Sequence, residues 1–314
     1  MENLFRHVRE ALPDSVEPVV KELSWYSDGF LKRMALCVEA FFHQGDVNHV
    51  TGDINFIAIF LKRKTVLTVL DVGFMKHPHP LARWVLKWFW IILPTHRVGA
   101  VTTISNSAKE ELLKYARVPA EKISVIYVPI LPGFERDIKP FNKEKPVLLQ
   151  VGTKGNKNLT RLIRAIRGIS CRLEIVGELD ESMRQLLKEC SVDFSNSCNL
   201  SNKEIIEKYI SADVICFTST YEGFGMPIVE ANAIGRVVVT SNILSMPEVG
   251  GDAAHYVDPF DVESIRAGII KVIEDDSYRE LLIRNGLLNV RRFDVHEIGR
   301  QYAELYHSVN TGLP

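Results

Sequence analysis

Residues 218–230 read TSTYEGFGMPIVE, and this stretch organises the interpretation of the whole chain. An apolar run at 213–217, DVICF, leads into it as an expected strand, and residues 228–234 lead out of it as an expected helix. Two glycines allow a tight turn in which the backbone can approach a ligand closely. Pro227 suits the first turn of a helix, where its missing N–H costs nothing. The stretch therefore predicts a strand, a glycine turn and a helix start.

The expected turn carries groups that suit a binding site. The free N–H groups at a helix start, here those of Gly225 and Met226 after Phe224, suit an anion such as a phosphate. Two glutamates, Glu222 and Glu230, flank the turn eight positions apart. Carboxylates accept hydrogen bonds well from sugar or ribose hydroxyls. The alternative is a surface turn with two solvated glutamates, which requires the glycines, the proline and both acids to coincide by chance.

The pattern E-G-F-G-x-P-x-x-E resembles the E-x7-E signature of retaining glycosyltransferases of the GT-B fold, specifically glycosyltransferase family 4. The resemblance covers residues 45–308 and is strongest across 146–290. It implies an α/β protein with two Rossmann-like domains that face a central cleft, and with a C-terminal helix that crosses back. The implied parts are an acceptor-side domain at 1–135, a nucleotide-sugar donor domain at 136–295 and the crossover helix at 296–314.

Composition and charge exclude several other classes of protein. The 314 residues suffice for two domains, and 46% hydrophobic with 25% charged residues is ordinary for a globular chain. The net charge of −1 argues against a general nucleic-acid binder. Five cysteines without CxxC spacing indicate reduced thiols, and neither a secretory signal nor a run of about 18 apolar residues is present. We therefore expect a cytoplasmic protein, with peripheral contact to the inner membrane face as an alternative.

One basic stretch stands out against the balanced total charge. Residues 62–97 hold seven basic residues against the single acid Asp71, a net of +6 with histidines neutral: Lys62, Arg63, Lys64, Lys76, Arg83, Lys87 and Arg97. Within it, RWVLKWFWIILP at 83–94 holds three of the four tryptophans. Aromatic residues beside Lys and Arg suit a membrane interface or an amphipathic acceptor. A buried helix with a basic rim explains the stretch equally well, because its apolar positions run nearly all round.

The first half of the chain alternates helices and strands, which implies a parallel sheet covered on both faces. The expected helices are 1–12, 29–42 and 108–115, and the expected strands are 47–52, 65–72, 101–104 and 123–128. Ser107 is the expected cap of the third helix, with Glu110 three positions on. A GT-B acceptor domain usually opens with a strand and a glycine-rich loop, whereas this chain opens with an expected helix. We therefore expect a first domain whose first strand is missing, either because the sequence is truncated or because this subgroup is built without it.

The resemblance singles out two residues of this half as catalytic candidates. VNHVTG resembles the family's strand that ends in a histidine near the acceptor, which points to His49. TVLDV resembles the strand that often ends in His-Asp, which points to Asp71, with Leu70 at the histidine position. A satisfied histidine at a strand end is the alternative for His49, and a capping or loop acid is the alternative for Asp71. His77 and His79 have no evident third metal ligand and are expected to be loop residues.

The second half opens with an expected strand at 146–151 and the turn GTKGNKN. A strand, a glycine turn with lysines and a helix make a phosphate site by geometry, and the absence of GKS or GKT excludes a Walker A loop. The turn resembles the family loop in which an Arg and a Lys grip the nucleotide diphosphate. Lys157 matches that Lys, Thr153 stands at the Arg position, and Lys154 is the candidate for a second charge beside Gly152. A solvated loop lysine is the alternative for Lys157.

The remaining elements continue the alternation of strands and helices. We expect strands at 172–176, from 192 and at 236–240, and helices at 159–167, 180–190, 201–210, 262–274, 278–290 and 296–309. Gly177 ends the first of these strands and is expected at the nucleotide site, and the loop at 195–200 lies where the family cradles the base. Ser201 with Glu204 predicts a capping box for its helix.

The resemblance implies a hexosyltransferase-type, retaining glycosyltransferase that moves a sugar from a nucleotide diphosphate sugar to a sugar or lipid-linked sugar acceptor. The implied setting is cell-surface polysaccharide or glycolipid synthesis, with no nucleic-acid partner, no cofactor, no metal, and peripheral membrane contact through 83–94. Lys157 and the helix-start amides would hold the diphosphate, Glu222 the donor sugar and Glu230 the ribose. In this family the donor phosphate itself helps to deprotonate the acceptor.

Three other functions stay open at this point. A non-catalytic GT-B homologue that binds a nucleotide or a partner is suggested by the missing first strand and by Leu70 and Thr153. A nucleotide-sugar epimerase shares the fold class and needs no acceptor. A Rossmann dehydrogenase has the least support, because no expected strand is followed by GxGxxG.

Overall fold

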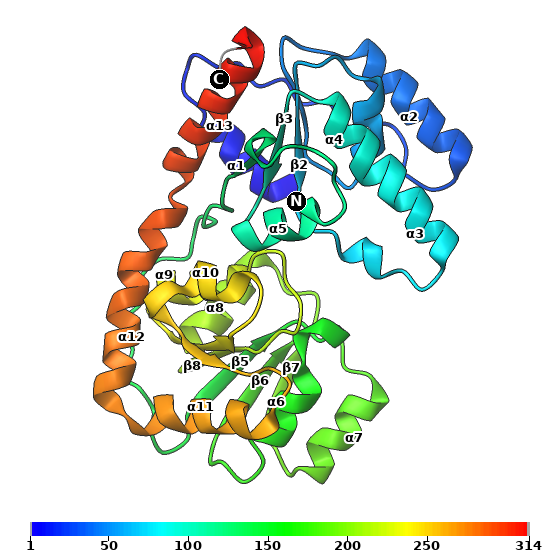
Figure 1. Ribbon diagram of the computed structural model, residues 1–314. Helices are drawn as coiled ribbons and strands as arrows, with labels where there is room; N and C mark the ends of the chain where they lie inside the picture. The colour runs from blue at the N-terminus through cyan, green and yellow to red at the C-terminus, as the bar shows by residue number, and fades with distance from the viewer. Residues whose placement is uncertain (1, 313–314) are drawn as a thin grey trace. The chain divides into compact units, whose positions relative to one another are not determined.

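The computed structural model describes residues 2–312, with side chains from residue 5 onward. The chain divides into two compact units, one formed by Met1–Pro129 with Val295–Pro314 and the other by Ile130–Asp294 (Figure 1). Each unit has its own parallel sheet, of order β1-β2-β3-β4 in the first and β10-β9-β8-β5-β6-β7 in the second. The expected α/β architecture with two parallel sheets is confirmed.

Unit 1 is built on a four-stranded sheet whose strands are covered by helices. Its strands are β1 (Asn48–Val50), β2 (Thr65–Val69), β3 (Ala100–Thr103) and β4 (Ile123–Val125). Its α-helices are α1 (Glu2–Glu10), α2 (Phe30–Phe42), α3 (Pro80–Leu86), α4 (Leu93–Arg97), α5 (Asn106–Leu113) and α13 (Val295–Thr311). Every residue of β2 is buried, as a β-branched run in a parallel sheet should be. Helix α13 packs on α1, where Tyr302 stacks edge-on against Phe5.

Unit 2 is a doubly wound sheet with helices on both sides (Figure 1). Its strands are β5 (Val147–Val151), β6 (Arg172–Val176), β7 (Asp193–Ser197), β8 (Val214–Phe217), β9 (Val237–Ser241) and β10 (His255–Val257). Its α-helices are α6 (Leu159–Ala165), α7 (Glu181–Glu189), α8 (Asn202–Ser211), α9 (Met226–Ile234), α10 (Ser245–Gly250), α11 (Val262–Glu274) and α12 (Asp276–Asn289). A continuous core of aliphatic side chains from β5, β6, α6 and α11 holds the layers together.

Two predicted helix caps had different outcomes. Ser201 caps α8 through a capping box with Glu204, as predicted. The prediction for Ser107 is wrong, because α5 begins at Asn106 and its cap is Ser105, whose hydroxyl accepts a hydrogen bond from the amide of Ala108 at 3.0 Å. β3 ends earlier than expected, so the extended backbone that a cap requires falls on Ser105.

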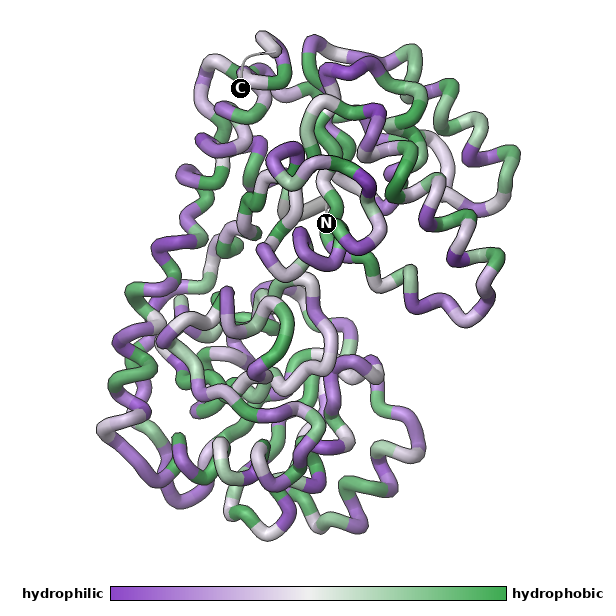
Figure 2. The backbone as a smooth tube through the Cα atoms, viewed as in Figure 1, coloured by the Kyte–Doolittle hydropathy of each residue, from purple (hydrophilic) through white to green (hydrophobic). Residues whose placement is uncertain are grey.

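The tryptophan-rich stretch is one helical run from α3 to α4, with a π-helix at Lys87–Ile92 between them. The wider turn of the π-helix allows three consecutive residues, Trp90, Ile91 and Ile92, to be buried. An α-helix on a surface buries one apolar stripe and does not bury three consecutive residues. Nearer the start of this run, in α3, Trp84 is 56% exposed and Leu81 is 73% exposed. The stretch therefore combines both expected alternatives, a buried end and an exposed apolar end. Figure 2 shows bands of hydrophobic residues along α2 and α3.

The length and polarity of a helix decide whether it can span a bilayer. Within residues 2–312, every helix is either too short or too polar to cross a membrane.

Candidate functional site

The strand order of unit 2 places two loops side by side at one edge of its sheet. The chain builds outward from β5 to β6 and β7, and then returns to the other side of β5 with β8 and β9. The chain therefore continues toward opposite sides of the sheet after β5 and after β8, which makes this edge a topological switch point. Open α/β sheets bind their ligands at such points. A hydrogen bond from the amide of Thr220 to the carbonyl of Asn156, 2.8 Å long, joins the two loops.

A lysine and a glutamate meet at this switch point. Lys157 ends a short 3-10 turn after β5, and its Nζ lies 2.7 Å from Oε1 of Glu222 in the loop after β8. The amide of Asn156 donates to the same oxygen at 3.2 Å and to the carbonyl of Tyr221 at 2.9 Å. Lys157 Nζ also lies 5.1 Å from the ring centroid of Phe217. Both charged side chains are about one-fifth exposed, so the pair is fixed by the protein and still accessible.

The loop after β5 is held by hydrogen bonds to its own carbonyls. Gln150, buried in β5, donates from Nε2 to the carbonyls of Gly152 and Lys157 at 3.1 Å each. Gly152 has φ of 90°, and a Cβ there would come within 3.1 Å of the Lys157 side chain. Asn158 has the left-handed φ of 62°, and its amide donates to the carbonyl of Thr218 at 2.9 Å. The position of Lys157 is therefore set by backbone geometry that only these small or amide residues adopt easily.

The second loop ends in the predicted helix start. Gly225 precedes α9 with φ of 121°, where a Cβ would come within 3.3 Å of Ile228. Met226 and Pro227 form the first turn, which leaves helix-start N–H groups at the loop. The Phe224 side chain is buried, with its ring centroid 5.7 Å from that of Phe293. The side chain of Phe224 is therefore part of the packing behind the loop.

Glu230 lies one turn further along α9 and has a partner that the sequence did not predict. The hydroxyl of Tyr209, a fully buried residue of α8, donates to Oε2 of Glu230 at 2.5 Å. Burial raises the pKa of Glu230 to about 7, against the lowering effects of the Tyr209 hydrogen bond and the charge of Lys157. Burial and the neighbouring Glu230 carboxylate raise the pKa of Tyr209 well above its usual value, so the tyrosine stays protonated as a donor. Glu230 is thus a carboxyl group that titrates near neutral pH.

Three further candidates lie around the first loop. Gly177 follows β6 with φ of 133°, and a Cβ there would come within 3.0 Å of the Thr153 side chain. Its carbonyl accepts from the amide of Asn196 at 2.7 Å. Lys154 is exposed. Thr153 and Gly177 are therefore brought together beside the switch point, whereas Lys154 faces solvent.

The two candidates of unit 1 are held in different ways. His49 has a partner for each ring nitrogen, the Tyr306 hydroxyl at Nδ1 and Thr68 Oγ1 at Nε2, both at 2.7 Å. Burial lowers its pKa to about 3, so the ring is neutral. Asp71 follows β2, and its Oδ1 accepts from the amide of Gly73 at 2.8 Å in a side-chain turn. The geometry favours the satisfied histidine for His49 and the capping acid for Asp71, which is exposed.

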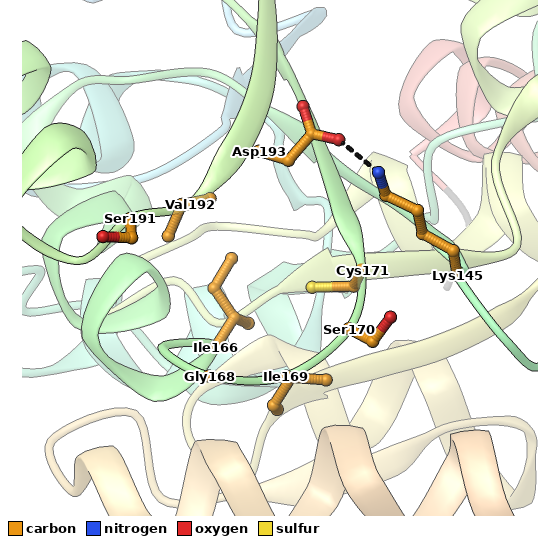
Figure 3. A pocket seen from close by; sticks show the side chains of 9 residues that line it. All are labelled: Lys145, Ile166, Gly168, Ile169, Ser170, Cys171, Ser191, Val192 and Asp193. Atoms are coloured by element: carbon orange, nitrogen blue, oxygen red, sulfur yellow. Dashed lines mark ion pairs between the residues drawn. The ribbon is translucent and has the colours of Figure 1, made fainter.

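Sequence reasoning missed several residues that shape the site, Tyr209, Asn156, Asn158 and Gln150 foremost. Asn158 carried the only usable signal, because Asn in a glycine turn is typical of a left-handed residue. A separate cavity of about 300 Å³ contains the Lys145–Asp193 ion pair, 2.8 Å long (Figure 3). It lies where β6 and β7 begin, and is therefore at the opposite edge of the sheet from the Lys157–Glu222 pair.

Comparison with known proteins gives one family match and several similar glycosyltransferases. Residues 133–288 match the family described as glycosyl transferases group 1. O-antigen chain mannosyltransferase B of Escherichia coli is 25% identical over 315 residues, covering 88% of this chain and 81% of that protein. O-antigen chain mannosyltransferase RfbU of Salmonella typhimurium is 29% identical over 219 residues, covering 67% of this chain and 61% of that protein.

A solved structure shares the fold across most of the chain. Anabaena Alr3699/HepE in complex with UDP and glucose superimposes with a TM-score of 0.75 at 18% identity, covering 88% of this chain and 82% of that one. At this identity the likeness concerns the fold alone. Residues 133–288, nearly the whole of unit 2, are therefore similar to the glycosyl transferases group 1 family, and the chain has the fold of the GT-B glycosyltransferases.

Proposed function

We propose that the protein is a retaining glycosyltransferase of the hexosyltransferase type. It transfers a sugar from a nucleotide diphosphate sugar to a sugar or lipid-linked sugar acceptor in cell-surface polysaccharide or glycolipid synthesis. The observation that carries the proposal is the Lys157–Glu222 pair at the switch point of unit 2, with the start of α9 in the same loop. The O-antigen mannosyltransferases among its relatives support the substrate class.

The diphosphate is held by positive charge from two sources. Lys157 supplies a fixed ammonium, and the amides of Gly225 and Met226 supply the N–H groups and dipole of a helix start. Gly152 lets the backbone approach the phosphates, with Thr153 at its side. When the bond to the sugar breaks, negative charge grows on the diphosphate, and preorganised cations and amides stabilise it best. Because these groups supply the charge, the proposed reaction uses no metal ion and no cofactor.

The donor sugar and the ribose are bound by the two glutamates. Glu222 accepts hydrogen bonds from the sugar hydroxyls. It also stabilises positive character at the anomeric carbon, and this effect is stronger because the side chain is only about one-fifth exposed to water. Glu230 accepts from the ribose hydroxyls, and Tyr209 fixes one of its oxygens so that the other faces the nucleotide. Gly177 and the loop after β7 provide backbone groups for the base. The donor phosphate removes the acceptor proton, so retention follows from attack on the face of the leaving group.

Unit 1 contributes the acceptor side in this proposal. Asp71 is an exposed carboxylate that can accept from an acceptor hydroxyl, whereas His49 serves the packing of β1 against α13. Residues 83–94 make peripheral contact with an anionic membrane, because Trp84 and Phe89 are exposed beside Arg83 and Lys87.

The first test is calorimetric binding of UDP, GDP, dTDP and ADP, without added metal, to the parent protein and to Glu230→Ala. One nucleotide should bind the parent and lose affinity in the variant. Two further variants divide the phosphate site: Lys157→Ala should weaken diphosphate binding, and Lys154→Ala, on the exposed part of the same loop, should not. Equal affinity of Glu230→Ala and the parent would remove the ribose assignment.

The second test decides between transfer and binding alone. NMR of the product formed with the matching donor sugar should show the anomeric configuration of the donor. Nucleotide binding without transfer to any acceptor would instead identify the non-catalytic alternative, which Leu70 and Thr153 favour.

A further inference from the structure

Glu222 is held by contacts from two neighbouring loops of unit 2, and not by Lys157 alone. Two neutral side chains contribute: Asn156 from the loop after β5, and Ser245 from the start of α10, after β9. Neither side chain has a part in the binding of the diphosphate, the sugar or the ribose as proposed above. Their geometry shows what they can do for the carboxylate.

Asn156 fixes both the carboxylate of Glu222 and the backbone just before it. Its Nδ2 donates to the carbonyl of Tyr221 at 2.9 Å and to Oε1 of Glu222 at 3.2 Å. Its own carbonyl accepts from the backbone amide of Thr220 at 2.8 Å, so the side chain extends from a backbone that is tied to the same loop. An amide nitrogen carries two hydrogens, and Asn156 directs both to consecutive residues of this loop.

Ser245 fixes the backbone of Glu222 from the other side. It is fully buried, and its Oγ donates to the carbonyl of Glu222 at 3.1 Å. The preceding residue, Leu244, has φ of 54° and ψ of −131°, a conformation that a leucine adopts only under strain. Strain of this kind persists where the surrounding structure fixes it, and it is common at functional sites. Helix α10 also packs on α9, the helix that follows the Glu222 loop (Figure 1).

A diphosphate competes with Glu222 for Lys157 in the proposed reaction. The ammonium group is attracted to both anions, so its 2.7 Å contact with Glu222 is exchangeable. Asn156 and Ser245 carry no charge, and a diphosphate therefore attracts them much less than it attracts Lys157. Their hydrogen bonds to Glu222 are the ones that persist when the donor is bound.

We propose that Asn156 and Ser245 are positioning residues, which hold Glu222 at the anomeric carbon of the donor sugar while Lys157 binds the diphosphate. The inference rests on the proposed function and deepens it, because both residues act through Glu222 and touch no substrate themselves. A displaced carboxylate stabilises the transition state less. Loss of either side chain should therefore lower kcat and leave nucleotide affinity nearly unchanged.

The test measures transfer of the sugar to water, which requires no identified acceptor. The donor is GDP-mannose, UDP-glucose, dTDP-glucose or ADP-glucose, according to the nucleotide that binds the parent, and calorimetry with that nucleotide gives the affinity. Asn156→Ala should lower kcat about tenfold and Ser245→Ala about threefold, each with nucleotide affinity within about twofold of the parent. Asn156→Asp should lower kcat more than Asn156→Ala, because its carboxylate cannot donate and repels Glu222. A role in packing alone predicts the reverse order, since Asp has nearly the shape of Asn.

Two matched variants control for loosening of the same loops. Thr220→Val removes a hydroxyl that donates to the carbonyl of Asn156 at 3.3 Å. Ser241→Ala removes a fully buried hydroxyl of β9 that donates to the carbonyl of Ser219 at 2.6 Å. Each of these bonds joins the loop after β8 to a neighbouring element, and neither reaches Glu222. Both variants should keep kcat within about twofold of the parent.

A double-mutant cycle shows whether the two residues act through Glu222. In a Glu222→Ala background no carboxylate remains to be positioned, so Asn156→Ala and Ser245→Ala should change the residual rate less than about twofold. Equal effects with and without the Glu222 carboxylate would overturn the inference. Parent-like kcat in both single variants, with loss only in Glu222→Ala, would remove the positioning role alone. A parent that binds its nucleotide and transfers sugar neither to water nor to an acceptor would remove the transferase proposal and the positioning role together.

Discussion

Replacing Glu230 by glutamine should make unit 2 more stable at alkaline pH and leave its stability at acid pH nearly unchanged. The side chain is buried on α9 against Tyr209, and burial raises its pKa from 4.5 to about 7. An unfolded chain ionises this group at its ordinary pKa, so the folded state holds more protons between these two values. The free energy of unfolding therefore falls as pH rises from about 4.5 to about 7.

The magnitude follows from the size of the pKa difference. At about 1.4 kcal/mol per pKa unit, a rise from 4.5 to about 7 corresponds to about 3 kcal/mol. Glutamine keeps an oxygen that accepts from the Tyr209 hydroxyl and never ionises. The stability advantage of Glu230→Gln over the parent should therefore grow by about 3 kcal/mol between pH 4.5 and pH 8.

The assay has to report on unit 2. Tryptophan fluorescence cannot do so, because Trp25, Trp84, Trp88 and Trp90 all belong to unit 1. Amide hydrogen exchange of peptides from β8 and α9, read by mass spectrometry from pH 5 to pH 8, gives the local free energy of opening. Glu280→Gln, on the exposed side of α12, is the matched control and should retain the pH dependence of the parent. A difference between Glu230→Gln and the parent that stays constant with pH would refute the reasoning.

The remaining predictions concern the proposed reaction. Below pH 7, nucleotide affinity should fall about tenfold per pH unit, because protonation of Glu230 removes the carboxylate that accepts from the ribose, and calorimetry in buffers of different ionisation enthalpy should show proton release on binding. Tyr209→Phe should move this pH dependence to higher pH, because the lost hydrogen bond no longer lowers the pKa of Glu230, and it should raise the KM for the donor while changing kcat little, as initial rates across pH would show. Glu222→Gln should lower kcat about 10²-fold or more and leave nucleotide affinity within about threefold, measured by rates and calorimetry together. Lys157→Ala should weaken a nucleoside diphosphate about tenfold or more and leave the nucleoside unaffected. Excess EDTA should leave the transfer rate unchanged, and a rate restored only by added metal would contradict the metal-free mechanism.

Sequence periodicity predicted most of the elements of unit 2 because its strands and helices follow the same burial pattern throughout. The expected strand 172–176 and helix 262–274 have the observed bounds of β6 and α11. A buried parallel strand reads as an unbroken apolar run, and a helix that covers it reads as an apolar stripe, so local sequence and tertiary packing agree. The capping box at Ser201 was predictable for the same reason, since all its partners lie within four residues.

Partners distant in sequence could not be predicted. His49 is held by Tyr306, 257 positions away, and no local sequence pattern predicts that contact. Tyr209 occupies an apolar-stripe position of α8, and only the packing of α8 on α9 shows that its hydroxyl meets Glu230. The π-helix that buries Trp90 departs from the period of 3.6 on which sequence reasoning depends. The candidate site was therefore predictable in its loops and not in the contacts that tune it.

The Lys157–Glu222 pair gives the strongest physical link between this site and sugar transfer. In the absence of a ligand the two charges neutralise each other at 2.7 Å, which is a modest interaction at a partly exposed position and is easily exchanged. In a transfer step, negative charge grows on the departing phosphate and positive charge grows at the anomeric carbon. An ammonium beside a carboxylate would present charges of opposite sign to both developing charges. Each side chain would then stabilise the transition state more than the ground state. Asn156 donates a second hydrogen bond to Glu222 from the loop after β5, so the carboxylate would keep a partner if a phosphate competed for Lys157.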